Sequence, residues 1–170
     1  MNPAYLGDSY DLVKRFFCRE LSLLGYSVTV DAMLTGSWNT NASEFYRLIG
    51  AEPLNREKPI SKRAALFIDP DTGINIRGGK QHASFDRLAR ESKNYELVFA
   101  FDQSFSRQAK AEDVIREKLS ALRARDCHGM YYDSHARFVF VANQESVLHE
   151  LQVQLVALGL PKSRLLTADA

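Results

Sequence analysis

The chain has 170 residues, of which 45% are hydrophobic and 25% charged, and this ordinary globular mix excludes a wholly disordered protein. Its 22 basic and 21 acidic residues leave a net charge of +1, so we expect no global attraction to nucleic acid, and any such contact would need a local basic patch. No apolar run approaches the roughly 20 residues of a membrane span, and the first residues lack the pattern of a secretory signal. We therefore expect one cytoplasmic domain over residues 1–170, with no membrane partner.

The first half of the chain predicts two helices and two strands. Apolar side chains recur at helical spacing over residues 8–24, with Asp8 at the N-cap and Gly25 at the stop. A strand is expected over residues 26–34, and a strand buried on both faces is expected over residues 64–68. A short helix is predicted over residues 43–49, and polar loops over residues 35–42 and 51–63.

The second half continues the alternation of helices and strands. Helices are predicted over residues 84–92, over residues 106–125 with Ser106 as the cap, and over residues 145–158. Strands are predicted over residues 96–101, 128–132, 136–142 and 164–167, and the middle two form a hairpin. This alternation predicts a three-layer, Rossmann-like α/β fold, whose mainly parallel sheet carries an antiparallel strand near the C-terminus.

The carboxyl ends of the parallel strands are the expected location of a functional site. The predicted strands and helices place the following polar residues at that edge: Asp8, Asp11, Asp69, Asp71, Lys80, His82, Asp102, Arg107, Asp133 and His135. No other surface of the predicted fold collects comparable residues.

Structural roles compete with functional ones for many of these residues. Asp8 serves equally as a helix cap, and the stretch from Asp69 to Gly73 serves equally as a turn. Single histidines are more often surface residues than ligands, and we expect His128 and His149 to be structural.

Several widespread motifs are absent from the sequence. No G-x-G-x-x-G follows the first strand, no G-x-x-x-x-G-K-[ST] occurs, and no G-x-S-x-G is present. These absences exclude the usual dinucleotide fingerprint, the P-loop and the hydrolase elbow. The two cysteines, Cys18 and Cys127, lie outside any metal or redox motif, and we expect buried structural thiols in a reducing compartment.

Residues 6–8 (LGD), residues 11–14 (DLVK) and residues 66–73 (LFIDPDTG) carry a resemblance to a group of bacterial and phage proteins. Those proteins open with an LGD…D-x-x-K helix and have an F-x-D-P-D-x-G strand end. More distantly, the layout is similar to the Rossmann-like fold of S-adenosylmethionine-dependent methyltransferases, in which a D-P-P-Y-type motif holds the target amine. That resemblance implies that residues 69–72 take the place of the motif and that Gly36, Ser37 and Trp38 take the place of the cofactor turn. The turn has one glycine here, and Asp71 and Thr72 replace the second proline and the aromatic residue.

These patterns lead to the hypothesis of a metal-assisted phosphoester hydrolase acting on a nucleic acid or nucleotide. In it, Asp69 and Asp71 hold Mg²⁺ or Mn²⁺, helped by Asp8 or Asp102. Lys80 or Arg107 stabilises the phosphate charge, and His82 or His135 acts as general acid or base. The helix over residues 106–125 has a basic face, which is either a solvated surface or a local, salt-sensitive nucleic-acid patch. The alternatives are a non-catalytic binding module on a methyltransferase-like scaffold and an atypical methyltransferase.

Overall fold

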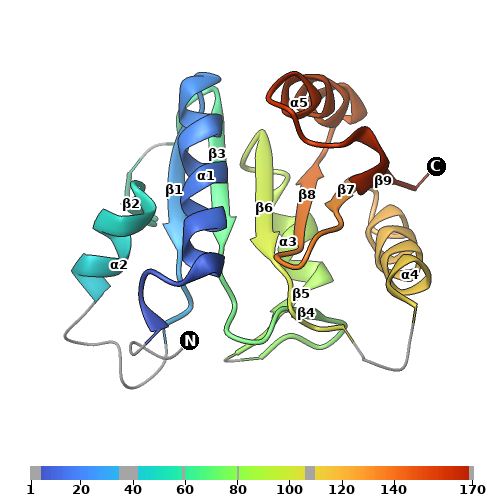
Figure 1. The fold of residues 1–170 in the computed structure, drawn as a ribbon, viewed down its shortest axis with the longest axis horizontal. Helices are drawn as coiled ribbons and strands as arrows, with labels where there is room; N and C mark the ends of the chain where they lie inside the picture. The colour runs from blue at the N-terminus through green and yellow to red at the C-terminus, as the bar shows by residue number, and fades with distance from the viewer. Residues whose placement is uncertain (1–4, 35–41, 59, 80, 106–109, 169–170) are drawn as a thin grey trace.

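The computed structural model describes residues 5–34, 42–58, 60–79, 81–105 and 110–168. Its centre is a seven-stranded sheet in the order β2-β1-β3-β6-β8-β7-β9 (Figure 1). The strands of this sheet are β1 (Ser27–Asp31), β2 (Glu52–Pro53), β3 (Ala64–Ile68), β6 (Leu97–Phe101), β7 (His128–Tyr132), β8 (Phe138–Ala142) and β9 (Leu165–Thr167). Two further short strands, β4 (Ile74–Asn75) and β5 (Ala83–Ser84), pair with each other beyond the carboxyl end of β3.

The sheet is mostly parallel. Strands β2, β1, β3 and β6 run parallel to their neighbours, whereas β8 is antiparallel to both β6 and β7, and β9 is antiparallel to β7. Strand β7 therefore points the same way as β6, and its carboxyl end lies at the same edge of the sheet. The sequence predicted one antiparallel strand near the C-terminus, and the structure has two, β8 and β9.

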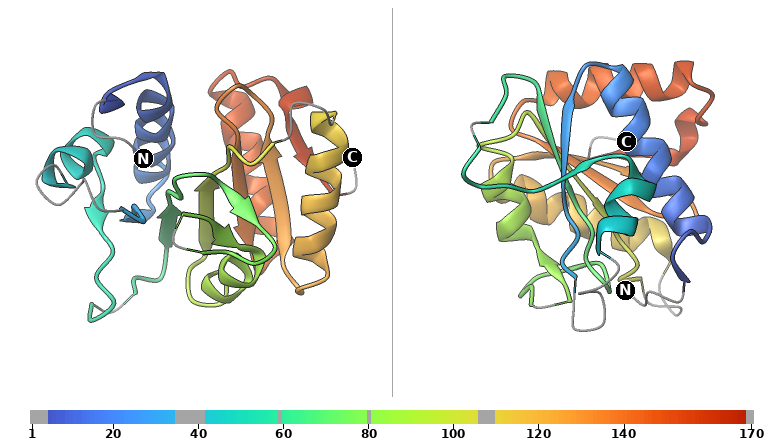
Figure 2. Two further views of the ribbon diagram at one scale, coloured as in Figure 1. Left: turned by 90° about the horizontal axis from the view of Figure 1, so that it is seen from below. Right: turned by 90° about the vertical axis from the view of Figure 1, so that its left-hand side faces the viewer.

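Helices pack against both faces of the sheet through two hydrophobic clusters. The helices are α1 (Ser9–Leu23), α2 (Ala42–Ile49), α3 (Phe85–Glu91), α4 (Ala111–Arg123) and α5 (Glu145–Ala157). Side chains of β6 alternate between the two clusters: Phe99 packs with α1, α2 and α5, and Val98 packs with α3 and α4. Figure 2 shows α4 and α5 on opposite sides of the strands. No helix in the described part of the chain is long and apolar enough to cross a membrane.

Helix α1 begins and ends where the sequence predicts. The Asp8 side chain accepts hydrogen bonds from the backbone N–H groups of Tyr10 and Asp11, which satisfies two donors of the first turn. Gly25 follows the C-terminus with φ of +88°, a conformation that glycine adopts without steric cost. The N-terminus of α1 lies at the carboxyl edge of the sheet, beside the residues that follow β3 and β6.

Three local expectations differ from the structure. The loop predicted over residues 51–63 contains β2, and the loop after β3 contains β4. The long helix begins at Ala111 rather than at Ser106, because the backbone of Lys110 is extended, with φ of −67° and ψ of 130°. Two-residue strands have no periodicity of their own, so only their pairing with a neighbour defines them.

Candidate functional site

A cleft of about 230 Å³ opens at the carboxyl edge of the sheet, between the N-terminus of α1 and the ends of β3 and β6. The chain passes from β1 to β2 on one side of β1 and returns to β3 on the other, so β1 and β3 flank a switch in strand order. Ligands of open α/β sheets bind outside the carboxyl ends of strands, and the cleft lies at that edge, one strand away from the switch, at the ends of β3 and β6. The cleft is lined by Tyr5, Asp8, Tyr10, Asp11, Lys14, Pro70, Asp71, Phe101 and Gln103.

A buried ion pair forms the floor of this cleft. The ammonium group of Lys14 donates to Asp11 Oδ1 at 3.0 Å and to Asp69 Oδ2 at 2.9 Å. The same ammonium lies 4.9 Å from the centre of the Phe101 ring, within the range of a cation–π interaction. Burial lowers the pKa of Lys14, but the two carboxylates outweigh this effect and raise the pKa above its ordinary value. Lys14 is therefore a permanent positive charge beneath the cleft.

Asp69 is fully buried, and its two carboxyl oxygens differ. Oδ2 accepts from Lys14, whereas Oδ1 is buried without a hydrogen-bond partner in the described part of the chain. Burial raises the pKa of Asp69 to about 6, against the opposing charge of Lys14. A buried acceptor without a donor is costly, and a proton or a metal cation would satisfy it.

The two other acidic residues of α1 in the cleft have structural bonds. Asp8 caps the helix through Oδ1, and Asp11 Oδ2 accepts from the backbone N–H of Gly7 at 3.0 Å. Asp11 thus holds the turn before the helix with one oxygen and Lys14 with the other. The competing interpretation of Asp8 as a cap is confirmed, and its Oδ2 has no partner among the described residues.

Tyr10 and His135 form a pair beside the cleft. The Tyr10 hydroxyl lies 2.8 Å from His135 Nε2, and the two rings stack with centres 5.5 Å apart. His135 comes from the turn between β7 and β8, so the pair joins two segments that are distant in the sequence. The predicted position of His135 at the carboxyl edge is therefore confirmed.

Asp102 lies on the opposite face of the sheet from Asp69. It accepts hydrogen bonds from Lys118 at 2.5 Å, from Tyr131 at 2.8 Å and from the backbone N–H of Ile74 at 3.0 Å, and Ser104 Oγ lies 2.6 Å away. Burial raises the pKa of Asp102, but these donors outweigh it and hold the pKa below its ordinary value. The expected convergence of Asp102 with Asp69 and Asp71 is thus wrong, because successive residues of a strand point to opposite faces.

His82 also lies away from the cleft lining. Its ring nitrogens lie 2.8 and 3.1 Å from the hydroxyl of Thr72, which donates to the backbone carbonyl of Gln81. These contacts, with the backbone bond from Thr72 to Gln81, fasten the segment after β3 to the segment before β5. In this structure His82 acts as a loop contact, whereas Asp71 lines the cleft.

Several expected site residues lie outside the described residues. They are Gly36, Ser37, Trp38, Lys80, Ser106 and Arg107. The described part of the expected basic patch has less exposed positive charge than the sequence suggests, because Lys118 is buried against Asp102. Arg125 pairs with Asp86 at 2.6 Å and Arg116 pairs with Asp113 at 3.4 Å. Both arginines thus have a neighbouring carboxylate that reduces their local charge.

Lys14 is a charged cleft residue that was not selected as a site residue from the sequence, although it ends the D-x-x-K motif. Its position on the buried face of α1, between Asp11 and Phe17, could have revealed it, because a lysine on an apolar helix face needs a buried counter-charge. In the described part of the chain, no group of three or more His, Cys, Asp or Glu side chains could hold a metal ion. Mg²⁺ commonly binds through one or two carboxylates and completes its shell with water and substrate oxygens.

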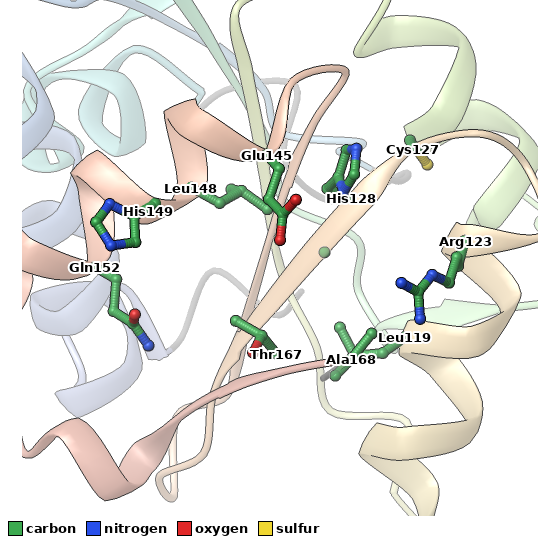
Figure 3. Close-up of a pocket in the computed structure, with 11 residues that line it drawn as sticks. Leu119, Arg123, Cys127, His128, Glu145, Leu148, His149, Gln152, Thr167 and Ala168 are labelled. Carbon is green, nitrogen blue, oxygen red and sulfur yellow. The ribbon is translucent and has the colours of Figure 1, made fainter. Parts of the chain in front are cut away.

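A second hollow, of about 130 Å³, lies among α4, α5, β7 and β9 (Figure 3). Its polar lining includes His128 and Glu145, which come from the start of β7 and the start of α5. Cys127 also borders it, but this thiol is buried and contacts the carbonyl oxygen of Leu122, and burial raises its pKa to about 11. This hollow is smaller than the cleft, and its cysteine remains a protonated, unreactive thiol at neutral pH.

No family model, no curated protein and no solved structure matches the chain. The chemistry of the cleft is therefore the basis on which a function is inferred.

Proposed function

We propose that the protein is a metal-assisted phosphoester hydrolase acting on a nucleic acid or nucleotide, with its site in the cleft beside α1. The observation that carries this proposal is the buried Asp69 carboxylate, one oxygen of which bonds to Lys14 while the other has no partner among the described residues. The two-sided packing of helices also supports a three-layer, Rossmann-like arrangement, in which such a site is usual.

Asp69 and Asp71 are the residues that would hold the metal, because they follow β3 directly and Asp71 lines the cleft. The proposed set is this pair alone, because no three described His, Cys, Asp or Glu side chains lie close enough to share a metal. Asp8 caps α1 at the same cleft, and Asp102 lies on the other face of the sheet. A divalent cation bound there would polarise a phosphoryl oxygen and lower the pKa of an attacking water. Mg²⁺ or Mn²⁺ fits this all-oxygen set.

The residues around the cleft supply the remaining groups. Lys14 keeps its positive charge and offsets the negative charge of Asp11 and Asp69. His135 contacts the hydroxyl of Tyr10, which lines the cleft. It is our candidate for the general acid or base. Lys80 and Arg107 remain our candidates for stabilising the phosphate charge.

A non-catalytic binding module is the second candidate function. One observation favours it: the Lys14 ammonium already lies between Asp11 and Asp69, so these carboxylates are balanced in part without a metal. An atypical methyltransferase is a third outcome, which binding of S-adenosylmethionine would reveal.

The test compares melting temperatures with and without Mg²⁺ or Mn²⁺ for the native protein, Asp69→Asn, Asp71→Asn and the control Asp113→Asn. Asp113 is an exposed carboxylate on α4, outside the cleft. A metal at a hundredfold excess over its dissociation constant stabilises the folded state by about 2.7 kcal/mol, or roughly 5–10 °C for a chain of this size.

We expect the metal-induced shift in the native protein and in Asp113→Asn, a large loss of it in Asp69→Asn and a partial loss in Asp71→Asn. Metal-dependent cleavage of a phosphodiester, measured on the same variants, should follow the same order. A native protein that shows no shift and no cleavage with either ion refutes the hydrolase. The binding module then leads, unless S-adenosylmethionine binds.

A further inference from the structure

The cleft has an aromatic wall that metal binding does not use. The rings of Tyr5, Tyr10 and Phe101 line it, and Tyr5 is 66% exposed although it is a large aromatic side chain. The Tyr10 ring is held in place by Phe101, 5.3 Å away between ring centres, and by His135. An exposed aromatic ring beside a fixed one provides a stacking surface for a flat ligand.

The charge of the cleft decides which part of a nucleotide can enter it. Asp8 and Asp11 line the cleft, and the positive charge of Lys14 is shared between Asp11 and the buried Asp69. The lining is therefore negative, and it repels a phosphate group that carries no metal. A neutral group that donates hydrogen bonds is favoured instead.

Two side chains of the cleft can read such a group. Asp8 Oδ2 has no partner among the described residues and can only accept while it is ionised. Gln103, which is exposed, follows the end of β6, and its amide both donates and accepts. Adenine and cytosine carry exocyclic amino donors that suit these two side chains, whereas uracil has none.

The size of the cleft limits the ligand. Its volume of about 230 Å³ is below the roughly 300–1,000 Å³ of pockets that enclose drug-sized ligands. One ring system fits this space better than a whole nucleotide, so the base would enter the cleft and the sugar and phosphate would lie at its opening. A base inside a duplex is stacked and paired and cannot enter, whereas an unpaired base can.

We propose that the cleft binds the amino-bearing base of an unpaired nucleotide, stacked on Tyr5 beside the fixed wall of Tyr10 and Phe101 and read by Gln103 and Asp8. This inference rests on the proposed function only in taking a nucleotide as the substrate class. It makes single-stranded nucleic acid or a free nucleotide the substrate, rather than a duplex.

The test measures binding of the nucleosides adenosine, cytidine and uridine by calorimetry, without metal, to the native protein and three variants. Nucleosides carry no phosphate, so a metal at Asp69 or Asp71 cannot influence the result. The variants are Tyr5→Ala, Tyr5→Phe and Gln103→Ala, and Gln144→Ala, an exposed glutamine at the start of α5, is the control.

We expect adenosine and cytidine to bind at least tenfold more tightly than uridine. Tyr5→Ala should weaken binding about tenfold, because stacking of one base on an aromatic ring contributes about 1–3 kcal/mol. Tyr5→Phe and Gln144→Ala should bind as the native protein does, and Gln103→Ala should reduce the preference over uridine.

Absent binding of all three nucleosides, equal binding of all three, or binding unchanged by Tyr5→Ala would overturn the proposal. A metal-induced melting shift together with absent nucleoside binding would overturn the base site and retain the hydrolase. Nucleoside binding without any metal effect would retain the base site and overturn the hydrolase.

Discussion

Asp69 and Asp102 each follow a strand of the sheet by one residue, and the two strands, β3 and β6, are neighbours. Their surroundings nevertheless differ, because Ile68 pairs with Ala100 and this register places Asp69 level with Phe101. Asp102 is then one residue further and points to the other face. There, Lys118 and Tyr131 satisfy its charge, whereas Asp69 keeps one oxygen without a partner in the described structure. An unsatisfied buried group is the more informative of the two for function.

The raised pKa of Asp69 predicts how stability depends on pH. The folded protein holds a proton on Asp69 up to a pH of about 6, whereas the unfolded chain loses it near the ordinary value of 3.8. The stabilisation from this proton is therefore complete below the unfolded pKa and is lost as the pH rises through the folded pKa. The free energy of unfolding of the native protein, relative to that of Asp69→Asn, should fall between pH 4 and pH 7, by at most about 1.4 kcal/mol per pH unit.

Urea unfolding of both proteins across that range measures the difference. The two proteins differ only at residue 69, so contributions of groups that do not interact with this residue cancel in the comparison. A difference that is constant with pH, or that grows in favour of the native protein, would show that Asp69 is ionised throughout and fully compensated by Lys14.

Part of the candidate site could be predicted from the sequence. Placing Asp69, Asp71 and His135 at one edge needed only strand ends and the parallel direction of the strands. Placing Asp102 on the opposite face from Asp69 required the register of β3 against β6, which cannot be predicted from local sequence. Lys14 was accessible from helical spacing alone, because it lies on the same face as Phe17 and Leu21.

At the scale of elements, long apolar or periodic segments were predicted best. The strand predicted over residues 64–68 has the same limits as β3, and the predicted hairpin is formed by β7 and β8. The short strands β2, β4 and β5 were missed, since each depends on a partner strand rather than on its own composition. The start of α4 was misplaced because a serine looked like a cap, whereas the extended Lys110 precedes the helix.

The turn between β3 and β4 offers an element-scale prediction at Gly73. Its φ is +93°, and an added Cβ would clash with Asp102 Oδ1 and lie 2.7 Å from the backbone nitrogens of Gln103 and Ser104. Gly159, after α5, has a similar φ of +99° with nothing within 4 Å of an added Cβ. Gly159→Ala should therefore cost only the conformational strain, about 1 kcal/mol.

Gly73→Ala should cost more than this control by a further 1–3 kcal/mol or so, because it adds overpacking against backbone atoms that cannot rotate away. Denaturant unfolding of both variants measures the two costs. Equal destabilisation would indicate that the loop after β6 moves aside freely, and that the Asp102 hydrogen bonds do not hold the turn in place.

At the scale of the whole molecule, the sheet separates two hydrophobic clusters, and different polar groups lie at the carboxyl edge of each. The cluster containing α1, α2 and α5 ends at the cleft, with its buried Lys14. The cluster containing α3 and α4 ends at the satisfied Asp102–Lys118 pair. One face of the sheet thus borders the cleft of the proposed site and the other supports a fixed polar network, although the strands between them are shared.

The two free cysteines can test whether these clusters unfold as one domain. Cys18 lies in the cluster of α1 and Cys127 in the cluster of α3 and α4, and both thiols are buried with their pKa values raised by burial. A protonated, buried thiol does not react with an alkylating reagent until the structure around it opens. Because β3, β6 and β8 contribute side chains to both clusters, we expect one cooperative unfolding transition.

Alkylation at increasing urea, read at each cysteine by peptide mass spectrometry, should then give a single midpoint for Cys18 and Cys127. Faster labelling of Cys127 in dilute urea, with an unchanged midpoint, would report local opening at the hollow of Figure 3, which this residue borders. Two separate midpoints would instead mean that one face of the sheet unfolds while the other remains folded, and the chain would then behave as two cooperative units.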